Sequence, residues 1–172
     1  MTKTCAIIGC SPMNYLWGFD EEDERCAALK LILMNQISKL RGEGCTRFAV
    51  SLDCGVGLYV AEIIRGLKES DGELKAVCYV PYEEQATKWT PELRDRYFNA
   101  LAECTEVINV SYEKTVGCEF RAHLAAMNEA DTVIAVYASD DPICEREASA
   151  AAIAEMLNKQ VFTLDPKAIR LS

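Results

Sequence analysis

Short apolar runs alternate along the chain with longer segments in which apolar residues recur at helical spacing. The short runs, rich in Ile, Val and Cys, predict buried strands, and the longer segments predict helices that each bury one face. The predicted strands lie at residues 4–9, 45–50, 75–80, 106–110, 131–137 and 160–164. The predicted helices lie at about 22–41, 58–67, 91–102, 117–129 and 145–157. This strict alternation predicts an α/β fold, an open and mostly parallel sheet with helices on both faces.

The same arrangement predicts where a ligand would bind. No internal repeat, linker or low-complexity run divides the sequence, so we expect one domain over residues 1–172. In open parallel sheets, ligands bind beyond the carboxyl ends of the strands, where the strand order reverses. The strand ends at Gly9, Asp53, Pro81, Ser111 and Ala138 would then share one edge of the sheet.

The segment S-L-D-C-G-V-G-L-Y-V-A-E at 51–62 joins a predicted strand to a predicted helix through a glycine turn. Gly55 and Gly57 permit backbone angles and close approaches that a β-carbon would prevent. Free N–H groups at the start of the helix, together with the positive end of its dipole, form a natural site for an anion. The alternative is an ordinary turn whose glycines serve the geometry alone.

Composition indicates the cellular location and the class of partner that we expect. Half of the residues are hydrophobic, yet no stretch approaches the ~18 consecutive apolar residues of a transmembrane helix, and no signal peptide is expected. Nine scattered cysteines, without any C-x-x-C pair, indicate free thiols and a cytoplasmic location. The formal net charge of −9 disfavours direct nucleic-acid binding, whereas a small anion remains compatible through local N–H groups.

Three familiar motifs are absent from the sequence. Neither G-x-G-x-x-G nor G-x-x-x-x-G-K-[ST] occurs, which disfavours a standard dinucleotide-binding fold and a P-loop NTPase. G-x-S-x-G is also missing, which disfavours an α/β-hydrolase.

The single histidine and the cysteines are candidates for chemistry. His123 lies one turn after Glu119 in a predicted helix, so we interpret the two as an exposed i,i+4 pair, with a base or ligand role as the alternative. Cys54 lies close to a helix start, where a lowered pKa would make it a nucleophile. With Cys118 and His123 it could bind zinc, but the spacing is not typical of zinc sites and no metal is expected. We interpret each cysteine as a small apolar filler, with thiol chemistry as the alternative.

Four further residues have a functional and a structural interpretation. Glu62 could act as a general acid or base or bind ribose hydroxyls, or be a solvated helix acid. Arg121 could clamp a phosphate, or lie free on the surface. Trp89 and Tyr82 could form an aromatic wall for a base, or cover the edge of the sheet.

Several segments resemble the YpsA-like branch of the SLOG superfamily, whose relatives include Smf/DprA and the LOG phosphoribohydrolases. They are S-x-x-x-G-V-x-L-Y-V-A-E at 51–62, P-Y-x-x-Q-x-x-x-W at 81–89, R-x-R-Y-x-x-x-L at 94–101, Y-x-x-x-x-G-C-x-x-R at 112–121 and A-D-T-V-I-A-V-Y at 130–137. The resemblance covers nearly the whole chain and implies a three-layer, Rossmann-like sheet with a crevice for a nucleotide-derived ligand. Most members of this branch have no assigned reaction.

The resemblance carries a set of pocket residues onto this chain. They are Gly9, Cys10, Ser11, Pro12, Ser51, Gly55, Glu62, Gln85, Trp89 and Arg121. Asp53, Gly57 and Tyr82 at the strand ends complete the predicted ligand-binding set. Relatives commonly have G-H-R-P after the first strand, an arginine-rich fourth helix and a glycine-rich turn after the fifth strand. This chain instead has G-C-S-P at 9–12, F-R-A at 120–122 and D-D-P-I-C at 140–144, which removes cations and adds acids.

We therefore expect a protein that binds or senses a nucleotide-like small molecule, without a required cofactor, across the ends of the first, second and fifth strands. One alternative is a nucleoside-phosphate N-glycosidase in which Glu62 stabilises the transition state. Another is an interaction scaffold with a decayed site, which docks a partner through exposed rings at Tyr15, Trp17 and Phe19. Relatives suggest a homodimer.

Overall fold

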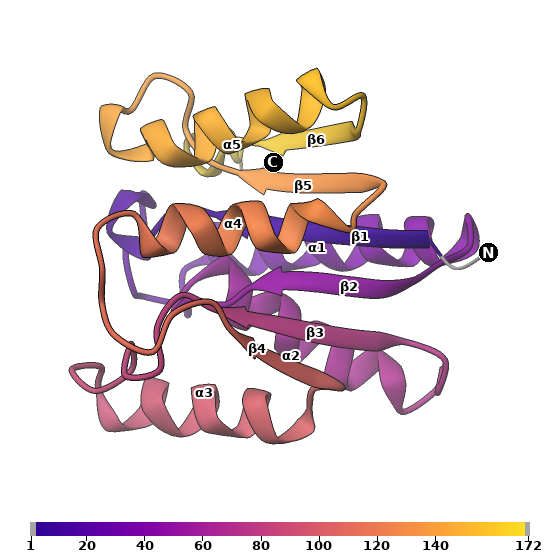
Figure 1. Cartoon of the computed structure of the whole chain (residues 1–172), viewed down its shortest axis with the longest axis horizontal. Coiled ribbons are helices and arrows are strands. Elements are labelled where there is room, and N and C mark those ends of the chain that lie inside the picture. The colour runs from indigo at the N-terminus through magenta and orange to yellow at the C-terminus, as the bar shows by residue number, and fades with distance from the viewer. Residues whose placement is uncertain (1–2, 171–172) are drawn as a thin grey trace.

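The computed structural model describes residues 3–170, which form a six-stranded parallel sheet in the order β4-β3-β2-β1-β5-β6 (Figure 1). The strands are β1 (Lys3–Gly9), β2 (Cys45–Ser51), β3 (Lys75–Val80), β4 (Glu106–Asn109), β5 (Thr132–Val136) and β6 (Gln160–Leu164). The helices are α1 (Glu24–Gly42), α2 (Val56–Lys68), α3 (Pro91–Glu103), α4 (Cys118–Asn128) and α5 (Glu145–Met156). Every neighbouring pair of strands is parallel, which confirms the predicted fold.

The helices cover both faces of the sheet, which explains why the inner strands are mainly apolar. In β1, Cys5 and Ile7 face the core beneath α1 and α2, and Ala6 and Ile8 face the core beneath α4 and α5. Side chains alternate between the faces of a strand, so a sheet covered on both sides needs apolar residues at every position. The α4–α5 core is rich in alanine, which lets these helices lie close to the sheet.

The strand order reverses at β1, which lies between β2 and β5. The carboxyl ends of the first, second and fifth strands are therefore neighbours, as predicted. A crevice is expected at this point in open parallel sheets. α4 crosses from the β4 side of the sheet to β5 and contacts β1, β2 and β3 on the way (Figure 1). This crossing brings the first turns of α4 and α5 to the same edge as the glycine turn after β2.

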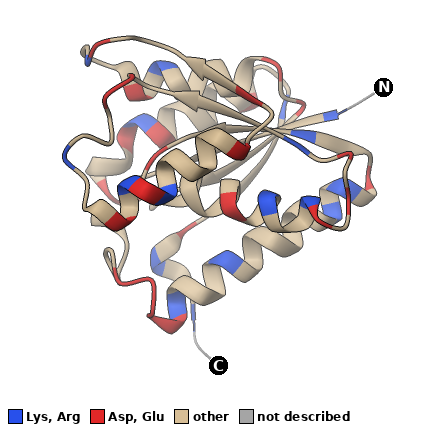
Figure 2. Ribbon diagram, turned by 90° about the horizontal axis from the view of Figure 1, so that it is seen from below, with Lys and Arg blue, Asp and Glu red and all other residues tan. Residues whose placement is uncertain are grey.

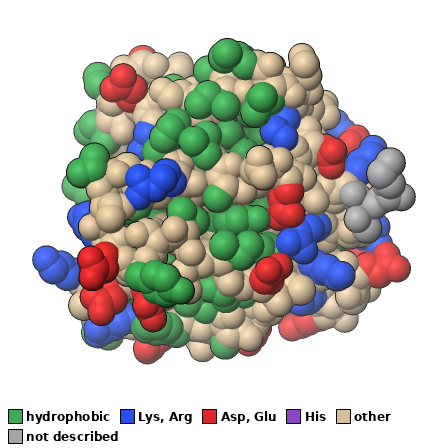
Figure 3. All heavy atoms as spheres, in the orientation of Figure 1, with side chains coloured by type: hydrophobic (Ala, Val, Ile, Leu, Met, Phe, Trp, Pro, Cys, Tyr) green, Lys and Arg blue, Asp and Glu red, His purple; other side chains and the backbone are tan. Residues whose placement is uncertain are grey.

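Charged residues are spread over the surface. Figure 2 shows acidic and basic residues interspersed along the helices instead of segregated into one basic face. The face that carries α4 and α5 mixes hydrophobic and polar side chains in the same way (Figure 3). Within residues 3–170, no helix has both the length and the apolar character that a membrane span requires.

Candidate functional site

Two adjoining cavities open at the carboxyl edge of the sheet. The smaller, of about 170 Å³, brings together seven of the predicted residues. They are Gly9, Ser11, Ser51, Asp53, Tyr82, Gln85 and Trp89. The larger, of about 1010 Å³, lies between the loop after β1 and the start of α3. The two cavities share Ser11, Cys54 and Trp89, so they adjoin at these side chains.

The glycine turn after β2 packs tightly against its neighbours. A β-carbon on Gly57 would overlap the backbone carbonyl oxygen of Ser51, and one on Gly55 would lie 2.6 Å from the hydroxyl of Tyr15. Both glycines are therefore required by close approach. Pro12 also packs against Gly55, so this part of the predicted pocket lies beneath the cavity and not on its wall.

The amides that begin α2 already have acceptors. The Asp53 carboxylate accepts hydrogen bonds from the N–H groups of Gly55 and Gly57, at 2.9 and 3.0 Å. The hydroxyl of Tyr15 accepts from the Val56 N–H at 3.2 Å. The position predicted for a phosphate thus holds a carboxylate of the chain itself, which meets the same demand for negative charge at a helix start. Asp53 would have to move before an anion could bind there.

Burial raises the pKa of Asp53 from 3.8 to about 6, against the opposing effect of the Gly55 and Gly57 N–H groups. An acid with a higher pKa in the folded chain binds more protons when folded. Its contribution therefore favours folding at low pH and is lost as the pH rises from about 4 to about 6.

Asp53→Asn keeps an oxygen acceptor for the two N–H groups but removes the charge. The difference in free energy of unfolding between variant and wild type should shift in favour of the variant by about 3 kcal/mol between about pH 4 and pH 7. Urea unfolding followed by tryptophan fluorescence at several pH values measures this difference, in which all other titrating groups cancel. A difference that stays constant with pH would contradict the raised pKa.

Three polar side chains from three elements form a buried chain of hydrogen bonds next to the smaller cavity. Ser51 Oγ at the end of β2 lies 2.7 Å from Nδ1 of His123 on α4. His123 Nε2 lies 3.0 Å from Oε2 of Glu147 on α5. The side chain of His123 is buried, so our interpretation of an exposed pair with Glu119 is wrong. α4 crosses the sheet at this point, and its crossing turns His123 toward β2.

Arg146 balances the negative charge of Glu147, the last residue of this hydrogen-bonded series. Its Nε donates to Glu147 Oε2 at 2.9 Å, and its Nη1 lies 3.9 Å from Oε2 of Glu119. Glu147 is fully buried, and its Oε1 has no hydrogen-bond partner among the described residues. Glu119, His123 and Arg146 all line the smaller cavity.

The sequence contained a signal for the burial of Glu147 that the prediction missed. Glu147 lies on the same helical stripe as Ala150, Ala151 and Ala154, all of which face the sheet. A carboxylate at the head of an apolar stripe is buried with it, and a buried carboxylate needs a donor.

Neither Cys10 nor Cys54 has the lowered pKa of a reactive thiol. Burial, and then the charge of Asp53, raise the pKa of Cys54 to about 12, so the alternative interpretation, a thiol with a lowered pKa, is wrong. Burial likewise raises the pKa of Cys10, which lies wholly inside the protein. Among residues 3–170, no three His, Cys, Asp or Glu side chains are grouped to hold a metal ion. Cys54 and Cys118 therefore do not join His123 in a zinc site.

Glu62 and Arg121 line neither cavity, as is also true of Cys10, Pro12, Gly55 and Gly57. Glu62 forms an ion pair with Arg96 at 2.6 Å, and Arg96 also binds Glu21 at 2.6 Å. Arg121 is exposed and donates to the Val116 carbonyl at 2.9 Å and to Thr115 Oγ1. Both side chains are held by local partners, which sequence spacing could not reveal.

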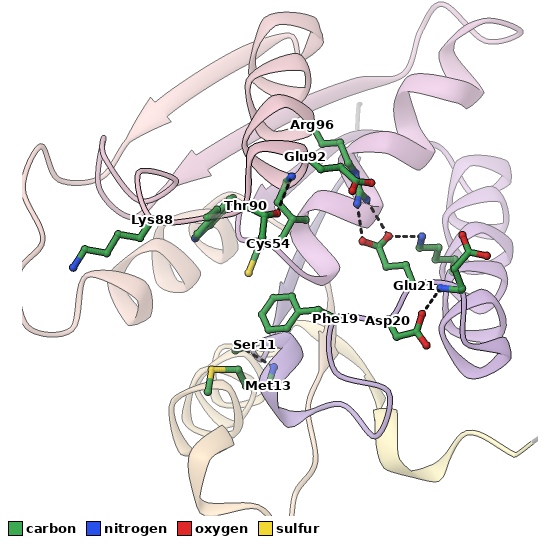
Figure 4. A pocket seen from close by; sticks show the side chains of 14 residues that line it. Ser11, Met13, Phe19, Asp20, Glu21, Cys54, Lys88, Thr90, Glu92 and Arg96 are labelled. Atoms are coloured by element: carbon green, nitrogen blue, oxygen red, sulfur yellow. Dashed lines mark hydrogen bonds and ion pairs between the residues drawn. The ribbon is translucent and has the colours of Figure 1, made fainter.

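The larger cavity has aromatic and aliphatic side chains on its walls. Figure 4 shows Ser11, Met13 and Phe19 on one side of it and Cys54 and Thr90 on the other. Trp89 also lines it and packs edge-on against the ring of Tyr97, with ring centres 5.1 Å apart. Gln85 is anchored beside it, with Nε2 donating to the Leu52 carbonyl at 3.0 Å.

The rings of the loop after β1 do not form a common exposed patch. Phe19 is 53% exposed, whereas Tyr15 and Trp17 are only 5% and 6% exposed. Tyr15 donates its hydroxyl to the Cys10 carbonyl at 2.9 Å, and the ring of Trp17 packs against it. The alternative prediction, a docking surface formed by all three exposed rings, is therefore wrong.

Comparison with known proteins gives a match over almost the whole chain. Residues 5–167 match the family model YpsA, described as the YspA SLOG family. A UPF0398 protein of Bacillus licheniformis is 30% identical over 100 residues, which are 58% of this chain and 54% of the relative. The UPF0398 protein YpsA of Bacillus subtilis is 29% identical over 101 residues, 59% of this chain and 56% of the relative. The matched part thus spans little more than half the length of these two relatives.

Proposed function

The chain belongs to the YspA SLOG family, and from this premise we propose that it binds a small, weakly charged, nucleoside-like molecule in the larger cavity. The observation that carries the proposal is the cavity itself, about 1010 Å³ at the carboxyl edge of the sheet, with Phe19 and Trp89 on its walls. Ligand sites in proteins are concave, partly aromatic and of this size. A flat base would pack against such rings.

The charges around the cavity support a ligand with little negative charge. Four acids and three cations line it. They are Asp20, Glu21, Glu22, Glu92, Lys30, Lys88 and Arg96. Two of the cations, Lys30 and Arg96, are already paired with Glu21, and Lys88 points away from the other labelled side chains (Figure 4). A diphosphate would lack free donors here, because the amides that begin α2 hold Asp53.

A thermal-shift panel tests the proposal. Free nucleosides and bases should raise the melting temperature more than nucleoside diphosphates, dinucleotides or ADP-ribose. A ligand at a hundred times its dissociation constant adds about 2.7 kcal/mol, which is roughly 5–10 °C for a chain of this size. Phe19→Ala should abolish most of the shift. Phe98→Ala should keep it, because Phe98 is 55% exposed like Phe19 but lies outside the cavity.

Three results would count against this function. A larger shift with diphosphates than with nucleosides would contradict the weakly charged ligand class. A panel without any shift, or an equal shift in Phe19→Ala, would contradict binding in this cavity.

A further inference from the structure

We propose that Ser51 is the nucleophile of a serine-type acyl-transfer site, with His123 as its base and Glu147 as the residue that positions the base. The substrate class is a small ester with a short acyl group. The inference rests on the hydrogen-bonded chain and the smaller cavity, and does not depend on ring binding in the larger cavity. It gives the protein a reaction beyond the binding proposed above.

The hydrogen bonds fix the protonation pattern that a base requires. The Glu147 carboxylate accepts, so the bond at 3.0 Å places the ring hydrogen of His123 on Nε2. Nδ1 then has a free lone pair, and Ser51 Oγ lies 2.7 Å from it. In familiar triads Nε2 faces the serine and Nδ1 faces the acid. Here the ring has the opposite orientation. The unprotonated Nδ1 still faces the serine hydroxyl, and the Nε2–H still donates to the acid.

The location of the hydrogen-bonded side chains Ser51, His123 and Glu147 favours a reactive site over a purely structural network. Ser51, His123 and Glu147 are 4%, 5% and 0% exposed, so water does not compete for their hydrogen bonds. A network that only tied α4 and α5 to the sheet could be covered completely. Instead, a cavity of about 170 Å³ opens directly over Ser51 and His123. Arg146 Nε balances the charge of Glu147 by donating to Oε2, the same oxygen that faces the histidine.

The reaction uses only the ester, water and these side chains. Ser51 Oγ attacks the carbonyl carbon and its proton passes to His123 Nδ1, which gives an imidazolium held through Nε2 by Glu147. The tetrahedral intermediate breaks its bond to the alkoxy oxygen, and the alcohol leaves with the proton from Nδ1. Water then attacks the acyl-serine with His123 as base, releases the carboxylic acid and restores Ser51.

The two cavities set the expected shape of the substrate. The smaller cavity has room for a short acyl group and not for a long chain. The leaving alcohol would extend past Ser11, Cys54 and Trp89 into the larger cavity, which shares these residues. A short acyl ester of a larger alcohol therefore fits the joined space.

Diisopropyl fluorophosphate tests the nucleophile in the wild-type protein without knowledge of the natural substrate. Ser51 Oγ would form a bond to phosphorus, fluoride would leave, and the proton would pass through His123 to solvent. Peptide mapping by mass spectrometry should place the adduct on Ser51. Ser51→Ala should not be labelled, whereas Ser38→Ala, which removes an exposed serine of α1 outside both cavities, should be labelled at the wild-type rate.

Three further variants separate chemistry from structure. His123→Gln should slow labelling and the hydrolysis of p-nitrophenyl acetate at least ~100-fold. Glu147→Gln can donate to Nε2 and so place the ring hydrogen on Nδ1, and it should slow both by about 1000-fold while its circular dichroism stays that of wild type. Glu147→Asp should recover part of the rate, which a merely structural role would not require.

The proposal is overturned if the wild-type protein carries no adduct on Ser51, or if His123→Gln is labelled as fast as wild type. Failure of this proposal is distinguishable from failure of the binding proposal, because the adduct on Ser51 and the nucleoside shift are separate measurements on the wild-type protein.

Discussion

Gly57→Ala is expected to lower the free energy of unfolding by about 3 kcal/mol or more, although it adds a single methyl group. The new β-carbon would overlap the backbone oxygen of Ser51 and would lie 3.0 Å from the Cα atom of Leu52. Both contacts are with backbone, which cannot rotate away as a side chain can. Either α2 must shift from the end of β2 or the strand end must distort.

Gly66→Ala is the matched control, because Gly66 lies in the same helix and a β-carbon there would meet nothing within 4 Å. It is expected to raise stability by about 0.5–1 kcal/mol, since alanine has the better helix propensity. Urea unfolding of the two variants measures the contrast. Equal effects of both substitutions would mean that the glycine turn has room for a side chain, against the packing described here.

The close packing at Gly57 also fixes the positions of Asp53 and Ser51. The close contact between α2 and the end of β2 holds Asp53 where its carboxylate reaches the Gly55 and Gly57 N–H groups. The same strand end carries Ser51. Loosening the turn should therefore disturb the hydroxyl as well as the helix, and Ser51 labelling should fall in Gly57→Ala beyond the loss caused by unfolding.

The fold could be predicted from the sequence because its signals are local and repeated. Apolar runs and helical spacing placed all six strands and all five helices of the described residues, and alternation gave the parallel sheet. Where boundaries differ, the cause is also local. α1 begins at Glu24, two residues later than expected, because the Asp23 side chain accepts from the Arg25 N–H and caps the helix there.

The site could be predicted only in part, because tertiary contacts decide which side chains reach the cavity. The strand ends were sufficient to predict Asp53, whose position follows from topology, and the family resemblance predicted Ser51. The positions of Glu62 and Arg121 could not be predicted without knowing their partners. Glu62 forms an ion pair with Arg96, and Arg121 donates a hydrogen bond to the Val116 carbonyl. His123 needed the path of α4 over β2, which no spacing within the helix encodes.

His123→Leu is expected to cost about 3 kcal/mol of unfolding free energy or more, because it leaves the fully buried Glu147 with Arg146 as its only hydrogen-bond donor among the described residues. Glu147→Met should cost less, since it removes the buried charge together with its need for donors. The double variant should be much less destabilised than the sum of the two, with a coupling of about 2 kcal/mol. Urea unfolding of the four proteins completes the double-mutant cycle.

Additive losses in this cycle would contradict a coupled buried pair. With strong coupling, the double variant becomes the most informative protein for the reaction. Apolar side chains of similar size can replace a buried ion pair at little cost to stability, so it should remain folded. Its Ser51 hydroxyl would lie at the same strand end but without a base, and labelling by diisopropyl fluorophosphate should be lost. A folded double variant that is labelled as fast as wild type would show that Ser51 reacts without His123.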